Sequence, residues 1–326
     1  MTPTSICRRH ILAAAAGLCI AGGAAAQAYP SKPVRIVVSF AAGGGVDMMA
    51  RLLADRLGKR LGQTFVVDNR PGASGIIGAD AVAKSAPDGY TLLAGGNPEL
   101  TFVQAVTPKL PYDPLQDLAP LVLVARVPSV LVVPAASPIR TAAEYFEQAR
   151  TERGISYGTP GRGTGMHLAF ELMNHMHGTK LIHVPYKGGG PATADVVAGQ
   201  VESAVINAPP LVPHIQSGKL RALAVLQDER SPQLPDVPTL KEATGINDLQ
   251  APAWFALSLP AKVPSDIRGQ LEAEVLQVLQ EPEVKSALAK AGLDVVALPS
   301  AEMGKLMEAE AAYNMATVKR LNFKLD

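Results

Sequence analysis

The strongest constraint on the fold is a strand, a glycine loop and a helix that follow one another within residues 34–57. Residues 34–40 are rich in β-branched side chains, which is typical of a strand. Three consecutive glycines, 43–45, follow, and apolar side chains then recur at helical spacing up to Leu57. A helix that starts from a glycine loop offers free N–H groups and the positive end of its dipole to an anion. An ordinary turn from strand to helix fits the same residues equally well.

The spacing of these glycines matches neither the dinucleotide-binding motif nor the phosphate-binding loop that ends in lysine and serine or threonine. If the loop binds an anion, the pattern therefore favours a smaller one, such as a carboxylate.

Residues 1–28 predict a signal peptide. Arg8 and Arg9 precede an apolar run over 11–20, and small residues at 26 and 28 form a cleavage site before Tyr29. The apolar run is too short to span a bilayer. The arginine pair leaves both general secretion and the twin-arginine route open. We therefore expect a soluble, exported protein.

Cysteine content and charge exclude several classes of protein. Cys7 and Cys19 both lie in the predicted signal peptide, so the rest of the chain has no disulfide and no thiol nucleophile. The chain carries 30 basic and 29 acidic residues, without the basic patch of a nucleic-acid-binding protein. At 326 residues it is long enough for two domains.

Strand and helix signals alternate along the chain, which predicts mostly parallel sheets with helices on their faces. Two apolar stretches, 121–133 and 254–259, look like crossovers between domains. We therefore expect one discontinuous domain over residues 29–128 plus 254–326 and a second domain over 129–253. Glycine clusters at 43–45, 72–75, 161–165 and 188–190 are expected to converge on one cleft, since ligands bind at the carboxyl ends of strands in such sheets.

Several polar residues lie beside these glycines. Asp47 is either an acid favoured by the first turn of its helix, or a residue that orients the glycine loop or meets an amine or hydroxyl of the ligand. Lys187 either attracts the anion or is a solvated lysine at the rim. Thr159 and Thr164 supply hydroxyl donors, and His167, directly after a glycine turn, is expected to face the cleft.

The sequence predicts no metal, no cofactor and no catalytic residue. His175 and His177 lie close to Glu171, but the spacing matches no metal-binding motif. There is no G-x-S-x-G motif, and Ser74 has no evident histidine partner. A binding protein is therefore favoured over an enzyme.

Together these residues resemble the extracytoplasmic receptors of tripartite tricarboxylate transporters, the Bug family. The matching motifs cover nearly the whole chain after residue 28, in the order of the family. They are Pro33-Val-Arg-Ile-Val-Val with Gly43-Gly44 and Asp47, Asn69-Arg-Pro-Gly-Ala-Ser-Gly75, Ala86-Pro-Asp-Gly-Tyr-Thr-Leu92, Gly163-Thr164 with His167-Leu168, Val184-Pro-Tyr-Lys-Gly-Gly, and Leu234-Pro-Asp-Val-Pro-Thr239.

The resemblance implies a type II periplasmic-binding-protein fold, with two doubly wound α/β domains joined by a two-strand hinge and a ligand cleft between them. Closure of the cleft would capture a small carboxylate, held largely by backbone amides, hydroxyls and bridging waters. Carried over by motif, the ligand contacts would come from Ala42, Gly43, Gly44, Gly45, Asp47, Gly95, Asn97, Thr159, Gly163, Thr164, His167, Lys187, Gly188, Gly189 and Asn207.

The implied function is a periplasmic receptor that captures a di- or tricarboxylate, an acidic amino acid or an aromatic acid. It would act as a monomer and deliver the ligand to membrane permease subunits or to a sensor. The alternative is a secreted two-domain enzyme that acts on a similar acid. The chain departs from the family at Ala41-Ala42, where members usually have proline, and at Gly45, which adds a glycine. Both changes predict a more flexible first loop.

Overall fold

The computed structural model describes residues 29–107, 109–246, 251 and 253–320. The chain divides into two compact units, Met1–Ser31 and Lys32–Asp326, and the structure below is that of the second unit. The predicted signal peptide, residues 1–28, lies outside the described residues. No helix within the described part of the chain combines the length and the hydropathy that a membrane span requires.

The first sheet has six strands in the order β11-β4-β10-β3-β1-β2. Strands β1 to β3 are parallel, whereas β10, β4 and β11 pair antiparallel. The elements of this half are β1 (Val34–Val38), α2 (Gly45–Leu61), β2 (Phe65–Asn69), the 3₁₀ turn η1 (Ala73–Gly75), α3 (Ile76–Ala83), β3 (Thr91–Gly96), the π-helical turn η2 (Pro98–Phe102), α4 (Val103–Val106), β4 (Leu118–Val127), β10 (Ala253–Pro260), α10 (Ser265–Gln280), α11 (Pro282–Lys290), β11 (Asp294–Pro299) and α12 (Ser300–Arg320).

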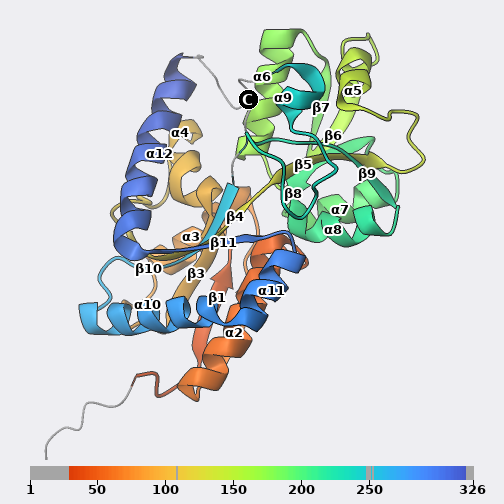
Figure 1. Ribbon diagram of the computed structural model, residues 1–326. Helices are drawn as coiled ribbons and strands as arrows, with labels where there is room; N and C mark the ends of the chain where they lie inside the picture. The colour runs from red at the N-terminus through yellow and green to blue at the C-terminus, as the bar shows by residue number, and fades with distance from the viewer. Residues whose placement is uncertain (1–28, 108, 247–250, 252, 321–326) are drawn as a thin grey trace, which may run out of the picture. The chain divides into compact units, whose positions relative to one another are not determined.

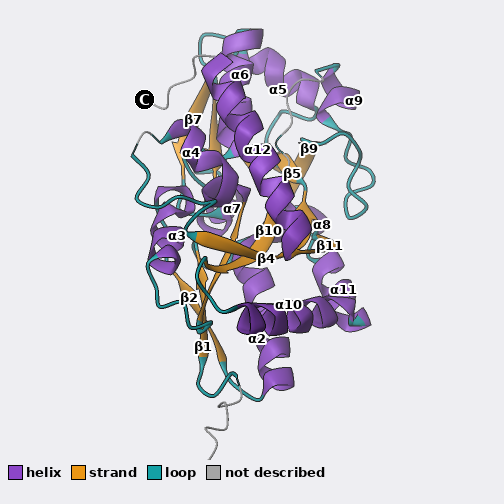
Figure 2. Ribbon diagram, turned by 90° about the vertical axis from the view of Figure 1, so that its left-hand side faces the viewer, coloured by secondary structure: helices purple, strands orange, loops and turns teal. Residues whose placement is uncertain are grey.

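Helices cover both faces of this sheet, as Figures 1 and 2 show. Helix α2 packs on β1, β2 and β3, and α10 packs on β4 beside α2. Helix α3 and α12 belong to a second apolar cluster that includes Val37, Leu93 and Trp254. Because successive strand residues point to opposite faces, the apolar run over residues 36–38 of β1 buries side chains on both sides.

The second sheet has five strands in the order β7-β6-β8-β5-β9. Strands β6, β7 and β8 are parallel, and β5 pairs antiparallel with β8 and β9. Its elements are β5 (Ser129–Pro134), α5 (Ala142–Ala149), β6 (Ile155–Thr159), α6 (Gly165–His177), β7 (Leu181–Pro185), α7 (Gly189–Val197), β8 (Ser203–Asn207), α8 (Ala208–Gln216), β9 (Leu220–Val225) and α9 (Leu240–Thr244).

The central strand β5 shows how this sheet is covered on both faces. Leu131 and Val133 join a cluster with side chains of α5, α6 and α9. Val130 and Val132 face the opposite way and join a cluster with α7 and α8. This alternation over a fully apolar run is what a strand buried on both faces requires.

Two extended segments connect the sheets. Strand β4 of the first sheet runs into β5 of the second with only Pro128 between them, and β10 pairs with β4 from Ala253 onward. The Ser129 hydroxyl donates to the Ala251 carbonyl at 2.7 Å, which ties the two segments together. The two-sheet α/β architecture and its connecting strands are confirmed. The residue boundaries given above for the two domains stay a prediction.

The structure differs from the sequence prediction in two respects. Both sheets are mixed rather than mostly parallel, because the connecting strands and their neighbours run antiparallel to the core strands. Helix α8, for which the sequence analysis makes no prediction, starts at Ala208. Prolines at 209 and 210 lie in its first turn, where the missing N–H groups would have no helical partner in any case.

Candidate functional site

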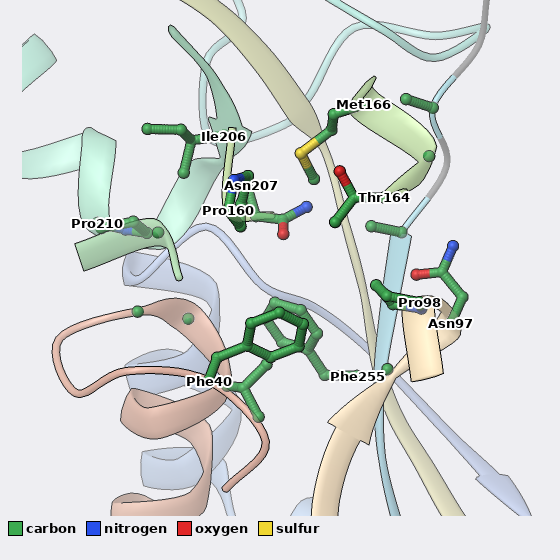
Figure 3. A pocket seen from close by; sticks show the side chains of 18 residues that line it. Phe40, Asn97, Pro98, Pro160, Thr164, Met166, Ile206, Asn207, Pro210 and Phe255 are labelled. Carbon is green, nitrogen blue, oxygen red and sulfur yellow. The ribbon is translucent and has the colours of Figure 1, made fainter. Parts of the chain in front are cut away.

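One pocket collects the ends of several helices and strands from both sheets. Its cavity volume is about 40 Å³, which is smaller than that of most small-molecule sites, so a ligand would need the walls to move apart. Figure 3 shows the rings of Phe40 and Phe255 on one side and Asn207, Thr164 and Met166 on the other. The lining is Phe40, Gly44, Gly45, Val46, Gly96, Asn97, Pro98, Pro160, Thr164, Gly165, Met166, Gly189, Ile206, Asn207, Pro210, Ala251, Ala253 and Phe255. We call this space the apolar pocket, since most of the side chains that line it are apolar and no charged residue of the described chain lines it.

Three helices begin at the apolar pocket. Gly45 starts α2, Gly165 starts α6 and Gly189 starts α7, and all three line the pocket. The first N–H groups of each helix have no partner inside the helix, and the helix dipoles place positive potential at these ends. The pocket is thus electropositive without any cationic side chain in its wall.

The starts of α2 and α7 lie against each other. The Ala41 N–H donates to the Lys187 carbonyl at 3.0 Å. Gly188, with φ +148°, approaches so closely that a Cβ there would lie 2.9 Å from the Ala41 nitrogen. A Cβ on Gly44 would lie 3.6 Å from the Gly189 nitrogen. Bare backbone at these positions lets the two glycine loops meet.

Asp47 holds the first loop in shape. Its carboxylate accepts from the Gly43 N–H at 3.0 Å, from Arg51 and from the Asn69 amide. The same Asn69 amide donates to the Phe40 carbonyl. Burial opposes the charge, but the hydrogen bonds from Arg51, Gly43 and Asn69 prevail and lower the pKa of Asp47. Asp47 is buried and does not line the apolar pocket, so its contacts fit the role of orienting the loop.

Thr159, Thr164 and His167 form the support of the α6 start. The Thr164 hydroxyl accepts from the His167 N–H and donates to the Gly161 carbonyl. The Gly163 N–H donates to His167 Nδ1 at 3.1 Å, which places the proton of a neutral ring on Nε2. The Thr159 hydroxyl lies 2.7 Å from Nε2 of His183.

The two histidine rings stack with centroids 3.9 Å apart. Burial, together with the charge of Arg162, lowers the pKa of His167 to about 4. Burial, His167 and Arg162 lower the pKa of His183 to about 3. Both rings are therefore neutral at pH 7, and they act as hydrogen-bonding supports of the loop rather than as cations.

A second pocket carries the positive charge that the apolar pocket lacks. Arg162 and Lys187 line it together with Ser74, and it shares Phe40 and Pro160 with the apolar pocket. Ser74 has a left-handed backbone conformation, with φ +54°, and its hydroxyl donates to the Arg162 carbonyl. We call this space the Arg162–Lys187 pocket.

Two acids, the buried Glu99 and the half-buried Glu310, fix the loop after β3. The Glu99 carboxylate accepts from the Ser39 hydroxyl at 2.6 Å and from the Gly96 N–H at 3.0 Å. Its burial is complete and raises its pKa to about 7. Glu310 of α12 accepts from Trp254 and Asn97, and burial raises its pKa too.

The structure brings six of the predicted contact residues to the apolar pocket: Gly44, Gly45, Asn97, Thr164, Gly189 and Asn207. Lys187 lines the Arg162–Lys187 pocket instead. Ala42 and Gly43 are exposed, and Gly188 is buried against Ala41. Asp47, Gly95, Thr159, Gly163 and His167 lie behind the pocket wall, where Gly95 gives room to the Glu99 carboxylate. Direct contact with a ligand stays a prediction for all of them.

Sequence reasoning missed the apolar wall made by Phe40, Met166, Ile206 and Phe255. Each of them sits next to a strand end or helix start that the motifs marked, but an apolar side chain there carries no signal that separates pocket from core. Packing, rather than flexibility of the loop, explains the additional glycine, Gly45. A Cβ on Gly45 would lie 2.7 Å from the Phe255 ring and 3.0 Å from Pro209, so close packing requires glycine there.

The arrangement is suited to binding an anion rather than to catalysis or metal binding. No acid–base pair lines the apolar pocket within the described residues. The same part of the chain holds no group of three or more histidine, cysteine or acidic residues placed to bind a metal ion.

Comparison with known protein families gives one match over most of the chain. The sequence profile described as the tripartite tricarboxylate transporter family receptor, TctC, matches residues 49–323. The chain is 38% identical over 288 residues to the protein BugT of Bordetella pertussis, covering 87% of this chain and 88% of BugT. It is also 38% identical over 293 residues to a protein encoded between tcbD and tcbE in Pseudomonas sp. strain P51, covering 89% and 87% of the two chains.

Solved structures agree with this match. The periplasmic binding protein BugD is similar with a TM-score of 0.86 at 29% identity, covering 91% of this chain and 99% of BugD. An R. palustris protein with adipate gives a TM-score of 0.85 at 35% identity, with 89% and 97% coverage. MatC from Rhodopseudomonas palustris with bound malate gives 0.84 at 31% identity, with 89% and 100% coverage.

The buried position of Glu99 predicts a specific dependence of stability on pH. Its pKa of about 7 in the folded protein lies above the ordinary 4.5, so the folded state binds the proton more tightly. The contribution of Glu99 to stability therefore falls as the pH rises from 4.5 to 7 and levels off above. Glu99→Gln removes this effect, and its stability relative to the wild type should rise by up to about 3 kcal/mol between pH 5 and 8.

Urea unfolding at pH 5, 6, 7 and 8 measures the difference between the two proteins. Subtracting the curves cancels the opposite trend of His167 and His183, whose lowered pKa values cost stability as the pH falls below 6.5. Glu308→Gln, on the exposed side of α12, is the control and should show no such trend. A stability difference for Glu99→Gln that stays constant with pH would contradict the assignment.

Proposed function

This chain belongs to the tripartite tricarboxylate transporter receptor family, and from that premise we propose that it binds a small organic carboxylate in the apolar pocket and delivers it to the membrane permease subunits of such a transporter. The family consists of periplasmic solute-binding receptors, so the chain is a receptor rather than an enzyme. We further propose that it is exported by its signal peptide, acts as a monomer and closes its two domains over the ligand.

One observation carries the proposal: three helix starts open on a single pocket, and no cationic side chain among the described residues lines it. Each helix end contributes about 0.3–1 kcal/mol to anion binding, and each charge-assisted hydrogen bond about 1.5–3 kcal/mol. A handful of such bonds is enough for the roughly −8 kcal/mol of micromolar binding, even after the cost of association. Neighbours of the same fold carry adipate and malate, both carboxylates.

We place the carboxylate of the ligand at the junction of α2 and α7. The nitrogens of Gly189 and Gly190 lie 3.6 and 3.7 Å from the place that a Cβ on Gly44 would take, so backbone from both halves of the molecule meets there. The ligand would thereby link the two halves, which couples binding to closure. Calorimetric titration of refolded, ligand-free protein with a panel of acids tests this function, since a receptor binds stoichiometrically and returns the acid unchanged.

Gly44→Val should abolish binding without unfolding the protein. The Gly44 backbone, at φ −85° and ψ 170°, is an ordinary extended conformation that valine adopts. The added side chain would cover the N–H groups of Gly189 and Gly190 and remove at least two charge-assisted hydrogen bonds, a loss of about 100-fold or more in affinity. Gly269→Val, on the exposed face of α10, is the control and should keep wild-type affinity. Wild-type affinity of Gly44→Val would exclude the α2–α7 junction from the site.

Asn207→Asp should separate binding from stability. Asn207 is the N-cap of α8, and its Nδ2 is buried without a hydrogen-bond partner among the described residues. Asn207 makes no capping hydrogen bond, and Pro209 and Pro210 have no N–H group for one, so the exchange breaks no cap. The helix dipole offsets part of the cost of the new charge, and the free energy of unfolding should change by no more than about 1 kcal/mol. Binding of a carboxylate should fall by about 100-fold or more, because the new charge repels the ligand at short range.

Asn207→Leu, which removes the donor without adding a charge, is the matched comparison and should lose only about tenfold. Titration calorimetry and urea unfolding give the two readouts. If Asn207→Asp bound the acid as tightly as the wild type, Asn207 would not face the ligand.

A further inference from the structure

The wall of the apolar pocket restricts the class of acid that it can take. Ten of the lining side chains are apolar: Phe40, Val46, Pro98, Pro160, Met166, Ile206, Pro210, Ala251, Ala253 and Phe255. Phe40 and Phe255 supply aromatic surface on one side of the pocket, and Met166 and Ile206 supply aliphatic surface on the other. A ligand that fills this space gains affinity by burying apolar atoms.

We infer that the ligand carries a single negative charge on a compact apolar body, so that this receptor selects monocarboxylates over di- and tricarboxylates of the same size. The inference rests on the proposed function, since it concerns the same pocket. The inference follows from the hydrogen-bond donors of the pocket wall. Some donors are already hydrogen-bonded within the protein, and others are absent because proline has no N–H group.

The start of α8 offers a second carboxylate almost no donor. The Ala208 N–H already donates to the Pro128 carbonyl at 3.0 Å. Pro209 and Pro210 have no N–H group, so the first turn of α8 presents carbon atoms to the pocket. Helix α8 therefore also begins beside the pocket, but its start is apolar, unlike the glycine starts of α2, α6 and α7.

The polar side chains of the wall are also largely occupied. Thr164 uses its hydroxyl to cap α6, and Asn97 donates to Glu310. Asn207 Nδ2 remains as a free donor, and it suits one neutral or charged acceptor of the ligand. A second carboxylate at the α6 start would repel the first carboxylate in the same pocket, and no cationic side chain of the described residues lines the pocket to offset that repulsion.

The cationic side chains lie in the neighbouring pocket, which shares Phe40 and Pro160 with the apolar pocket. Arg162 and Lys187 line the neighbouring pocket, are exposed, and are absent from the lining of the apolar pocket. A second charge buried in the apolar pocket would therefore be unpaired. Unpaired burial of one ion is expected to lower affinity by on the order of 100-fold.

The test compares acids that differ in charge but not in length. Adipate, its monomethyl ester and hexanoate form one series, and terephthalate and its monomethyl ester form a second. Titration calorimetry of the ligand-free wild-type protein at pH 8, where every free acid is ionised, gives the affinities. We expect each monoester to bind at least tenfold more tightly than its diacid, and hexanoate to bind at least as tightly as adipate.

The outcomes separate the inference from the proposed function. A diacid that binds more tightly than its monoester overturns the single-charge inference but leaves the receptor function standing. If no acid of a wider panel binds, the proposed function fails and the inference fails with it.

Arg162→Gln gives an independent check on the charge of the site. If the apolar pocket takes one charge held by helix starts, this variant keeps the affinity for the preferred monoacid within about twofold. A tenfold loss would mean that Arg162 pairs with a ligand charge, and it would overturn the inference. Urea unfolding of the variant shows whether any loss reflects the fold instead.

Discussion

The contact between two stretches of bare backbone determines the rest of this site. The 41–45 loop and the 187–190 loop come from different sheets and meet through the Ala41 N–H and the Lys187 carbonyl. Side chains at Gly188 or Gly190 would collide with the first loop, so glycine permits an approach that larger residues would block. The contact brings the starts of α2 and α7 together, and with them two sets of free N–H groups. An anion at this junction contacts both halves of the molecule at once.

Three acidic side chains support the loops around this junction without lining the pocket. Asp47 accepts a hydrogen bond from the 41–45 loop. Glu99 and Glu310 accept hydrogen bonds from the end of β3 and the loop that follows it. Each carboxylate accepts hydrogen bonds from the backbone or side chains of loops that shape the pocket wall, and none lines the pocket itself. Acids behind the wall can thus fix backbone donors in position, while the wall shows a ligand only N–H groups, amides and apolar atoms.

The sequence was most informative where glycine and alternation leave a pattern. The strand–glycine–helix units around Gly44 and Gly189 and the two crossovers were all predicted, because β-branched runs and glycine clusters follow from backbone geometry. The mixed sheets were not, since strand direction depends on pairing between distant segments. Helix α8 was not predicted, although Pro209 and Pro210 are both allowed in the first turn of a helix.

The pocket wall was predictable only in part, and the reason explains why ligand identity is hard to derive from motifs. Motifs mark positions where backbone must approach other backbone or a ligand closely, as at Gly44. The N–H groups of such backbone can donate to any carboxylate. Selectivity comes from what surrounds it: Phe255 packs over Gly45 in a space that a Cβ would fill, and the prolines of α8 remove donors that another sequence would supply. Both effects subtract interactions from a general anion site. Receptors with the same glycine loops can therefore diverge in ligand through a few apolar or N–H-lacking residues, while the junction that binds the carboxylate stays the same.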